Sequence, residues 1–219
     1  MISSKNHIKE KASIAVITAA GVEPEKDHPL LESRLAEWLE RRVSPLTKQE
    51  DDFRKACRDM MRNGSYKPTG RGKPASEYLL RTANQREFPR INTLVDINNY
   101  ISLKYLLPIS LWDANKVKAD SWLFRLGKPE ESFVFNLSGQ TLALKDLITG
   151  FAVKNGIESP IVTPVKDCQQ TKTGEETRNV AVAIYYPAHW ADMPTLKIIV
   201  EEFDELLKVV SEVVESTVV

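Results

Sequence analysis

Helical and strand patterns are segregated along this chain, and their order is the feature that most constrains its fold. Residues 13–20 form a short apolar run rich in isoleucine, valine and alanine, which predicts a buried strand. Helical spacing then dominates as far as Pro108, and short runs rich in Val, Phe and Tyr follow it. Helical spacing returns near the C-terminus. Helices and strands separated in this way predict an α+β fold rather than a doubly wound α/β fold.

Four helices are predicted before Pro108, over residues 27–43, 47–64, 75–84 and 90–108. Thr47 and Glu50 have the spacing of a capping box, in which each side chain satisfies a backbone donor at the helix start. Thr93 and Asp96 have the same spacing, so capping is the simplest interpretation of Asp96. The intervening residues 65–74 contain two prolines, two glycines and three cations, which predict a loop.

The division at Pro108 separates two kinds of structure without marking a domain boundary, because no flexible linker is present there. Strands are predicted within residues 122–126, 132–137, 141–147, 148–153 and 180–187. We therefore expect a single domain over residues 1–219. Its helix-rich part is residues 1–107, its strand-rich part is residues 108–190, and a C-terminal helix is predicted at residues 194–215.

Composition and motifs exclude several classes of function. The two cysteines, Cys57 and Cys168, are far apart and belong to no CxxC pair, which predicts reduced thiols in a cytoplasmic protein. The apolar run near the N-terminus is too short for a membrane span, so no membrane partner is expected. The chain has no phosphate-binding glycine loop, and its three histidines lack metal-ligand spacing. We therefore expect neither a cofactor nor a metal.

Positive charge is concentrated in one segment although the formal net charge of the chain is zero. Residues 54–90 contain ten cations and three acids, an excess of seven positive charges. One interpretation is a surface that binds RNA phosphates, for which the candidates are Arg62, Lys67, Arg71 and Lys73. The other is a solvated face that the acidic C-terminal part balances in the fold. Charge alone leaves both interpretations open.

The segment from residue 90 to 117 resembles the B3/B4 domain, the tRNA-binding and editing domain of the phenylalanyl-tRNA synthetase beta subunit. The matching positions are Ile91, Asn92, Val95, Asp96, Asn99, Tyr100, Pro108, Asp113 and Lys116. Residues 122–147 are similar to the family's arginine strand, acidic turn and hairpin. In the segment after this hairpin, the family's spacing is kept by Thr171, Thr177 and Asn179. The resemblance covers roughly residues 65–187 and is that of a free-standing member.

This resemblance implies a mixed α+β fold with a β-sandwich-like strand core flanked by helices. It also implies an aminoacyl-ester hydrolase, because the synthetase domain removes tyrosine wrongly attached to the phenylalanine tRNA. The candidate catalytic residues are then Asp167 and Lys166. The candidates for binding the substrate are Asn99, Ser110 and Thr171.

The chain departs from the synthetase pattern at three places in the expected pocket. Ser110 stands where the synthetase has a histidine, residues 164–168 replace a glycine-rich turn, and Ala183 replaces a glutamate. Asp167 or Lys166 is then expected to act with a different side-chain specificity. The plainer interpretation of Lys166 and Asp167 is an exposed turn pair, and that of Asp113 is a residue that stabilises its own turn.

Three functional hypotheses follow from the sequence. The first is a protein that binds an aminoacyl-tRNA terminus, with hydrolysis of the aminoacyl ester in trans as the activity if it is an enzyme. The second is a non-catalytic module that binds an amino acid or another small ligand. The third is a partner of a synthetase. Aminoacylation by this chain alone is excluded, because no ATP-binding signature is present.

Overall fold

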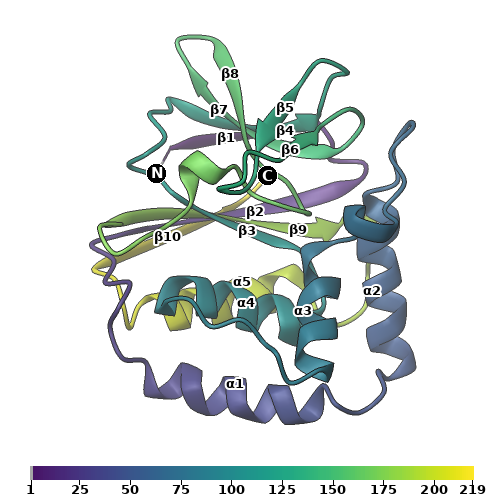
Figure 1. Cartoon of the computed structure of the whole chain (residues 1–219), viewed down its shortest axis with the longest axis vertical. Helices are drawn as coiled ribbons and strands as arrows, with labels where there is room; N and C mark the ends of the chain where they lie inside the picture. Colours follow the sequence, from purple (N-terminus) through teal and green to yellow (C-terminus); the bar gives the residue numbers. More distant parts are fainter. Residues whose placement is uncertain (1) are drawn as a thin grey trace.

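The computed structural model describes residues 2–219 and consists of two β-sheets and a layer of helices (Figure 1). The middle layer is a sheet with strand order β10-β2-β9-β3. Its strands are β2 (Ala12–Ala20), β3 (Ile109–Asp113), β9 (Asn179–Pro187) and β10 (Val213–Val218). All three pairings in this sheet are antiparallel. The long central pair, β2 and β9, connects the N-terminal and C-terminal parts of the chain.

A second sheet, with strand order β1-β4-β7-β8, lies above the middle sheet in Figure 1. Its strands are β1 (Ser3–Asn6), β4 (Ser121–Leu126), β7 (Ile148–Lys154) and β8 (Ile157–Val162). β1 is parallel to β4, and the other two pairings are antiparallel. A two-stranded hairpin of β5 (Ser132–Val134) and β6 (Thr141–Ala143) extends from one end of this sheet.

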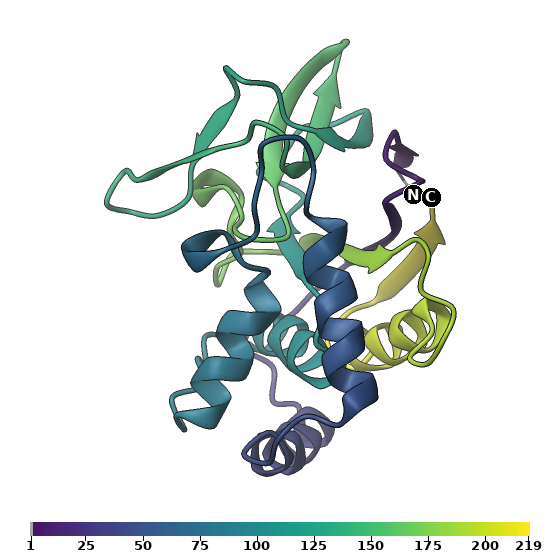
Figure 2. The same ribbon diagram turned by 90° about the vertical axis from the view of Figure 1, so that its right-hand side faces the viewer.

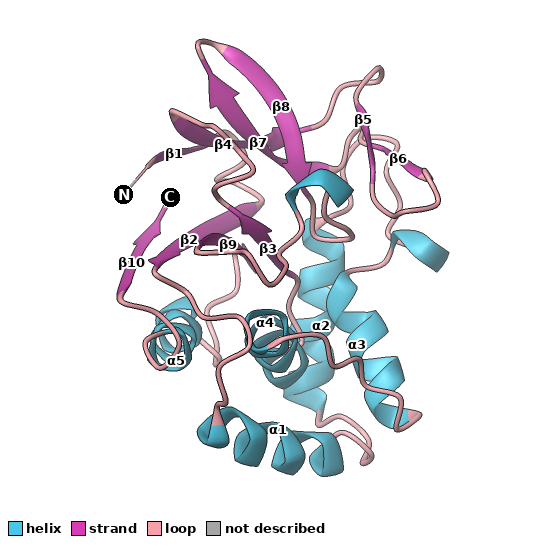
Figure 3. Ribbon diagram, turned by 60° about the vertical axis from the view of Figure 1, so that its left-hand side comes forward, coloured by secondary structure: helices cyan, strands magenta, loops and turns pink. Residues whose placement is uncertain are grey.

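The helices cover the opposite face of the middle sheet (Figures 1 and 3). α4 (Thr93–Tyr105) and α5 (Leu196–Leu207) pack on the sheet, and α1 (Pro29–Arg41) forms an outer layer. α2 (Lys48–Met60) and α3 (Ala75–Asn84) stand together at one side, as Figure 2 shows. Two short 3₁₀ turns, η1 (Gly70–Gly72) and η2 (Gln169–Thr171), complete the fold. No helix among residues 2–219 has the length and apolarity that crossing a membrane requires.

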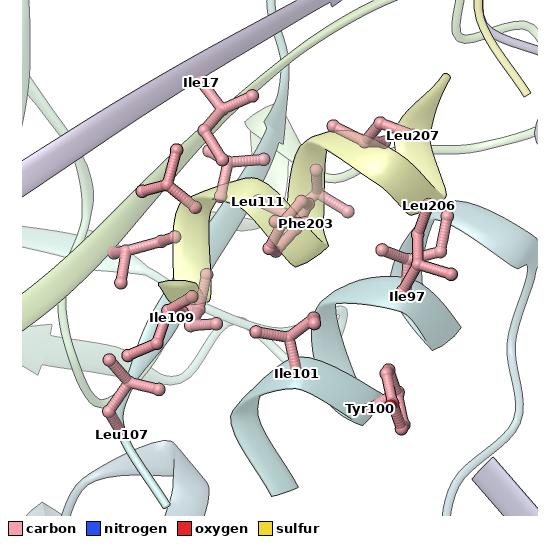
Figure 4. Packing of buried hydrophobic residues seen from close by; sticks show 14 of the residues in the cluster. Ile17, Ile97, Tyr100, Ile101, Leu107, Ile109, Leu111, Phe203, Leu206 and Leu207 are labelled. Atoms are coloured by element: carbon pink, nitrogen blue, oxygen red, sulfur yellow. The ribbon is translucent and has the colours of Figure 1, made fainter. Parts of the chain in front are cut away.

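The middle sheet is buried on both faces because β9 alternates between two hydrophobic clusters. Val182 and Ile184 face the helices, whereas Ala183 and Tyr185 face the second sheet. On the helix side, Phe203 of α5 and Ile97 and Ile101 of α4 fill the core (Figure 4). A strand with two apolar faces reads as a continuous apolar run, which explains the pattern of residues 180–187.

The α+β fold expected from the sequence is confirmed, and α2 begins with the predicted capping box between Thr47 and Glu50. Two details differ. The helix predicted at residues 194–215 ends at Leu207, because residues 213–218 pair with β2 as the edge strand β10. The N-cap of α4 is Asn92 rather than Thr93: its side chain accepts a hydrogen bond from the Val95 amide at 3.0 Å.

Asp96 has a different role from the predicted capping box. Its carboxylate accepts hydrogen bonds from the Arg90 guanidinium at 2.8 Å and from the Ile91 amide at 3.0 Å. It therefore holds the segment that enters α4, one turn before the helix.

Gly150 supplies a test of the packing between β4, β7 and β8. A Cβ at this position would lie 2.6 Å from Cγ2 of Val162 and 2.9 Å from Cε1 of Phe124. We expect Gly150→Ala to lower the free energy of unfolding by about 1–3 kcal/mol, because the core must shift to admit the methyl group. Gly174→Ala is the matched control, since nothing lies within 4 Å of a Cβ there. Urea denaturation checks this prediction, and equal midpoints for the two variants would contradict it.

Candidate functional site

A cleft of about 790 Å³ lies between the start of α3 and the turn that follows β8. One wall is the loop with η1 and the first two turns of α3, and the other is the turn at residues 163–166. The lining residues are Gly70, Arg71, Lys73, Pro74, Ala75, Glu77, Tyr78, Arg81, Val165 and Lys166. The basic segment and the turn that were singled out in the sequence, about 90 residues apart, therefore meet at one place.

Short-range and long-range hydrogen bonds hold the first wall of the cleft. The Tyr66 hydroxyl donates to the Gly72 carbonyl at 2.7 Å, which closes the loop around η1. The Ser65 amide donates to the Asp146 carboxylate at 2.7 Å and connects this loop to the segment after β6. The Ala75 amide donates to the Pro164 carbonyl at 2.9 Å, so the start of α3 is attached directly to the opposite wall.

The second wall is a tight turn organised by Thr163. The Thr163 hydroxyl oxygen accepts hydrogen bonds from the amides of Val165 at 3.2 Å and Lys166 at 3.0 Å. A serine or threonine hydroxyl commonly stabilises a turn in this way. The Ser110 hydroxyl on β3 donates to the Thr163 carbonyl at 3.0 Å and attaches the turn to the middle sheet. As a result, the Lys166 side chain is presented to the cleft.

The cleft carries an excess of positive charge. Its four cations, Arg71, Lys73, Arg81 and Lys166, form no ion pair with any residue in the described part of the chain. Glu77 is the one acid among the described lining residues, and its carboxylate is paired with cations outside the cleft.

The Glu77 carboxylate accepts a hydrogen bond from Arg58 at 2.6 Å and also pairs with Arg54 at 3.4 Å. Its side chain is only 10% exposed. Two guanidinium groups thus neutralise this carboxylate from the α2 side. The cations on the cleft side are left free to attract an anion.

Aromatic rings accompany the cations of the cleft. Tyr78 is 51% exposed, and the Arg81 guanidinium lies 5.3 Å from the centroid of its ring. The Lys166 ammonium lies 3.5 Å from the centroid of the Phe135 ring, just beyond β5. Burial is the largest cause of the lowered pKa of Lys166, and the charges of Arg71 and Lys172 lower this pKa further. Lys166 is therefore surrounded by positive charge, as a site for an anion requires.

The structure places Asp167 beside Lys166 in sequence but on the inner side of the turn. Asp167 is half-buried and lies near the Ser110 side chain, whose hydroxyl is 3.2 Å from that of Tyr185. Burial raises the pKa of Asp167 to about 7, and interactions with Ser110 and the Leu111 amide partly oppose that rise. Burial likewise raises the pKa of Tyr185. These three residues form a polar cluster between the two sheets, outside the lining of the cleft.

The other two expected substrate-binding residues lie elsewhere. Asn99 is on α4, on the helix-covered face of the middle sheet, and its side-chain oxygen accepts a hydrogen bond from Asn98 at 3.4 Å. Ser110 faces the opposite side of that sheet, so Asn99 and Ser110 do not meet. Thr171 is buried in η2, where its hydroxyl donates to the Cys168 carbonyl at 3.1 Å.

The four expected RNA-binding residues divide into two pairs. Arg71 and Lys73 line the cleft, whereas Arg62 and Lys67 do not. Arg62 is an exposed residue after α2 that pairs with Asp59 at 3.4 Å, and Lys67 is exposed in the loop before η1.

Asp113 has the expected structural role, because it accepts hydrogen bonds from the Asn115 amide at 2.9 Å and the Thr177 hydroxyl at 2.7 Å.

Sequence reasoning did not single out Tyr78 and Phe135 as members of a site. Tyr78 interrupts the apolar spacing of residues 75–84, which was the available signal for an exposed ring. Phe135 lies in an alternating run and reads as an ordinary strand residue. Their place beside the cations depends on contacts between distant segments, which no local pattern records.

The fold and the cleft define an α+β protein with a cationic surface site. The chain belongs to the B3/4 domain family, because the family model matches residues 56–191, more than half of its length. This confirms the family resemblance seen in the sequence. The matched region includes every lining residue of the cleft.

One similar solved structure is an N-terminal fragment of the phenylalanyl-tRNA synthetase beta-subunit from Pyrococcus horikoshii. The two chains are 9% identical and superpose with a TM-score of 0.49. The similarity covers 94% of this chain and 48% of that fragment, so this chain spans about half of the fragment's length. A comparison with curated proteins found no match.

The raised pKa of Asp167 predicts a specific dependence of stability on pH. The folded protein retains the Asp167 proton up to about pH 7, whereas the unfolded carboxyl, with its ordinary pKa of 3.8, loses it earlier. The contribution of this group to stability is therefore complete below about pH 4 and is lost as the pH rises to 7, by at most about 4 kcal/mol. We expect Asp167→Asn to match the parent protein at pH 4 and to be more stable at pH 8.

Chemical denaturation at the two pH values measures this difference. Asp192→Asn, at an exposed position, removes the same charge and is the control. A parallel pH dependence in the parent and in Asp167→Asn would show that the carboxyl titrates normally.

Proposed function

We propose that this protein binds the single-stranded end of an RNA, with the terminus of a tRNA or aminoacyl-tRNA as the substrate class. The observation that carries the proposal is the cleft, where Arg71, Lys73, Arg81 and Lys166 converge without a free carboxylate. Unpaired cations on two facing walls attract phosphates from both sides. The resemblance of the sequence to a tRNA-binding and editing domain supports tRNA as the RNA.

The aromatic rings favour a single strand over an RNA duplex. The exposed Tyr78 ring offers a flat surface for an unpaired base, and Arg81 at 5.3 Å adds a second planar group. A duplex hides the faces of its bases, whereas a single strand can stack them on aromatic side chains. The combination of four cations with an exposed ring is therefore typical of a site for single-stranded nucleic acid.

The proposal is for binding, and ester hydrolysis is not part of it. A general base must reach the attacking water, and the one carboxylate among the described lining residues, Glu77, is held by Arg54 and Arg58. The Asp167 carboxyl interacts with Ser110 and is not among the residues that line the cleft. A deacylation assay with mischarged tRNAs would reveal activity if substrate binding rearranges this turn.

Removal of cleft cations tests the proposal directly. We expect Arg71→Ala and Lys73→Ala each to weaken tRNA binding about three- to tenfold near 0.1 M salt. Each is also expected to reduce the slope of log affinity against log salt by about 0.7, because one phosphate contact is lost. Fluorescence anisotropy over a range of salt concentrations measures both quantities.

Arg62→Ala is the matched control for these variants. It removes one cation from the same basic segment, but Arg62 lies outside the cleft. If Arg62→Ala reduces affinity and slope as much as Arg71→Ala does, the whole segment attracts RNA and the cleft has no special role.

Tyr78 tests the preference for a single strand. We expect Tyr78→Leu to weaken binding of a short single-stranded RNA about tenfold or more, since stacking on one ring contributes about 1–3 kcal/mol. Tyr78→Phe keeps the ring and is expected to bind normally. Equal loss in both variants would assign the effect to the hydroxyl group and would remove stacking from the account.

A small anionic ligand is the second candidate, and the size of the cleft favours it. A volume of about 790 Å³ lies within the range of about 300–1,000 Å³ that small-molecule sites occupy. If a small anionic ligand and the RNA both use the cleft, we expect AMP to compete with the RNA for binding. Binding of AMP as tightly as a tetranucleotide would replace the RNA proposal with a nucleotide-binding one.

A further inference from the structure

The hairpin of β5 and β6 carries the most exposed large apolar residue in the described chain. Leu137 is 93% exposed at its tip, within the connection at residues 135–140. Isolated apolar residues are common on protein surfaces and need no explanation by themselves. Leu137 differs because hydrogen bonds hold its loop and because it stands next to the cationic cleft.

The loop that carries Leu137 is held by a closed set of hydrogen bonds. The Asn136 side chain donates to the Gln140 side chain at 2.8 Å and accepts from the Gln140 amide at 3.0 Å. The Phe135 amide donates to the Gln140 carbonyl at 3.0 Å. Gly139 has a φ of +74°, which glycine adopts without strain. The leucine is therefore presented on a preorganised support.

The loop end of the same hairpin is attached to the cleft. The Lys172 ammonium donates to the Phe135 carbonyl at 2.9 Å, and the Lys166 ammonium lies 3.5 Å from the Phe135 ring centroid. Leu137 is two residues beyond Phe135, a span of about 7 Å at most. In Figures 1, 2 and 3, the hairpin and η1 lie on the same side of the molecule.

Cations lie at the loop end of the hairpin. Lys166 and Lys172 contact Phe135 directly, and the charge of Arg71 reaches Lys166. Lys172 forms no ion pair with any residue between positions 2 and 219, and its charge lowers the pKa of the Asp167 carboxyl. An apolar tip beside Lys166 and Lys172 matches the end of a nucleic-acid duplex, where a flat base pair is flanked by phosphates.

A second exposed tip shows what a hairpin without this setting looks like. Ile157, next to the turn between β7 and β8, is 70% exposed. Its neighbour Glu158 is an acid that pairs with Arg125 at 2.6 Å. This hairpin projects at the top of Figure 1, away from η1. Glu131, directly before β5, pairs with the same Arg125 at 2.6 Å, so both hairpins supply an acid to this cation. The two tips differ in that Lys166 and Lys172 contact Phe135, beside the β5–β6 tip.

We propose that Leu137 stacks on the terminal base pair of an RNA duplex whose single-stranded 3′ extension enters the cleft. The substrate class is then an RNA with a junction between a duplex and a single strand, rather than any single strand. Leucine is among the apolar side chains that proteins place against base steps. This inference rests on the proposed function, because it requires that the cleft hold the extension.

Three RNAs test the inference when each is titrated into the full-length protein. They are a hairpin with a four-nucleotide 3′ extension, the same hairpin with a blunt end, and the free tetranucleotide. We expect the hairpin with the extension to bind about tenfold more tightly than the tetranucleotide. Leu137→Ser is expected to remove most of that advantage and to leave the affinity for the tetranucleotide unchanged.

Ile157→Ser is the matched control and is expected to leave all three affinities unchanged. Leu137→Met keeps an apolar tip and is expected to retain most of the advantage of the junction RNA. Thermal unfolding of each variant verifies that these exposed positions do not affect folding.

The outcomes separate this inference from the proposed function. If the parent protein binds the tetranucleotide and the junction RNA equally, or if Leu137→Ser weakens both alike, Leu137 does not recognise the duplex end. The cleft would still bind a single strand in either case. If none of the three RNAs binds the parent protein, both the inference and the proposed function are wrong.

Discussion

The burial of both faces of the middle sheet is the constraint on which the rest of the structure depends. Three of its strands, β2, β3 and β9, supply apolar side chains to the helices on one side and to the second sheet on the other, whereas β10 is a largely exposed edge strand. The two buried polar side chains on β3 that form hydrogen bonds are satisfied internally: Ser110 contacts Thr163 and Tyr185, and Asp113 contacts Thr177. Because the sheet is closed to ligands in this way, a binding site has to form at its rim.

The cleft forms at that rim because three long-range attachments bring separate segments together. Ser110 attaches the 163–166 turn to β3, the Ala75 amide attaches α3 to the same turn, and Arg58 holds Glu77 against α2. The last of these is electrostatic as well as structural. Because Arg58 pairs with Glu77, the one acid among the described lining residues does not compete with an incoming anion for the cations of the cleft. The Arg58–Glu77 pair is largely shielded from water.

Local signals predicted much of the fold, and long-range contacts account for what they did not predict. β2, β9 and the capped start of α2 follow from apolar runs and Thr47–Glu50 spacing. β10 was not predicted as a strand, because its six residues continue the apolar pattern of the preceding helix. Arg71 and Lys73 were predicted by charge density, whereas Tyr78 and Arg81 join them only through the orientation of α3. Asn99 and Ser110, which the family resemblance grouped together, lie on opposite faces of the middle sheet.

The central claim is that one cleft, rather than the whole basic segment, is the RNA-binding site. NMR titration of the labelled protein with a short single-stranded RNA tests this claim most directly, because every backbone amide reports its own position. We predict saturable shifts concentrated at Arg71, Lys73, Tyr78 and Lys166, with Arg62 and the exposed residues of α1 and α5 unchanged. Shifts that spread over all basic residues without saturation, or that centre on another surface, would contradict the account.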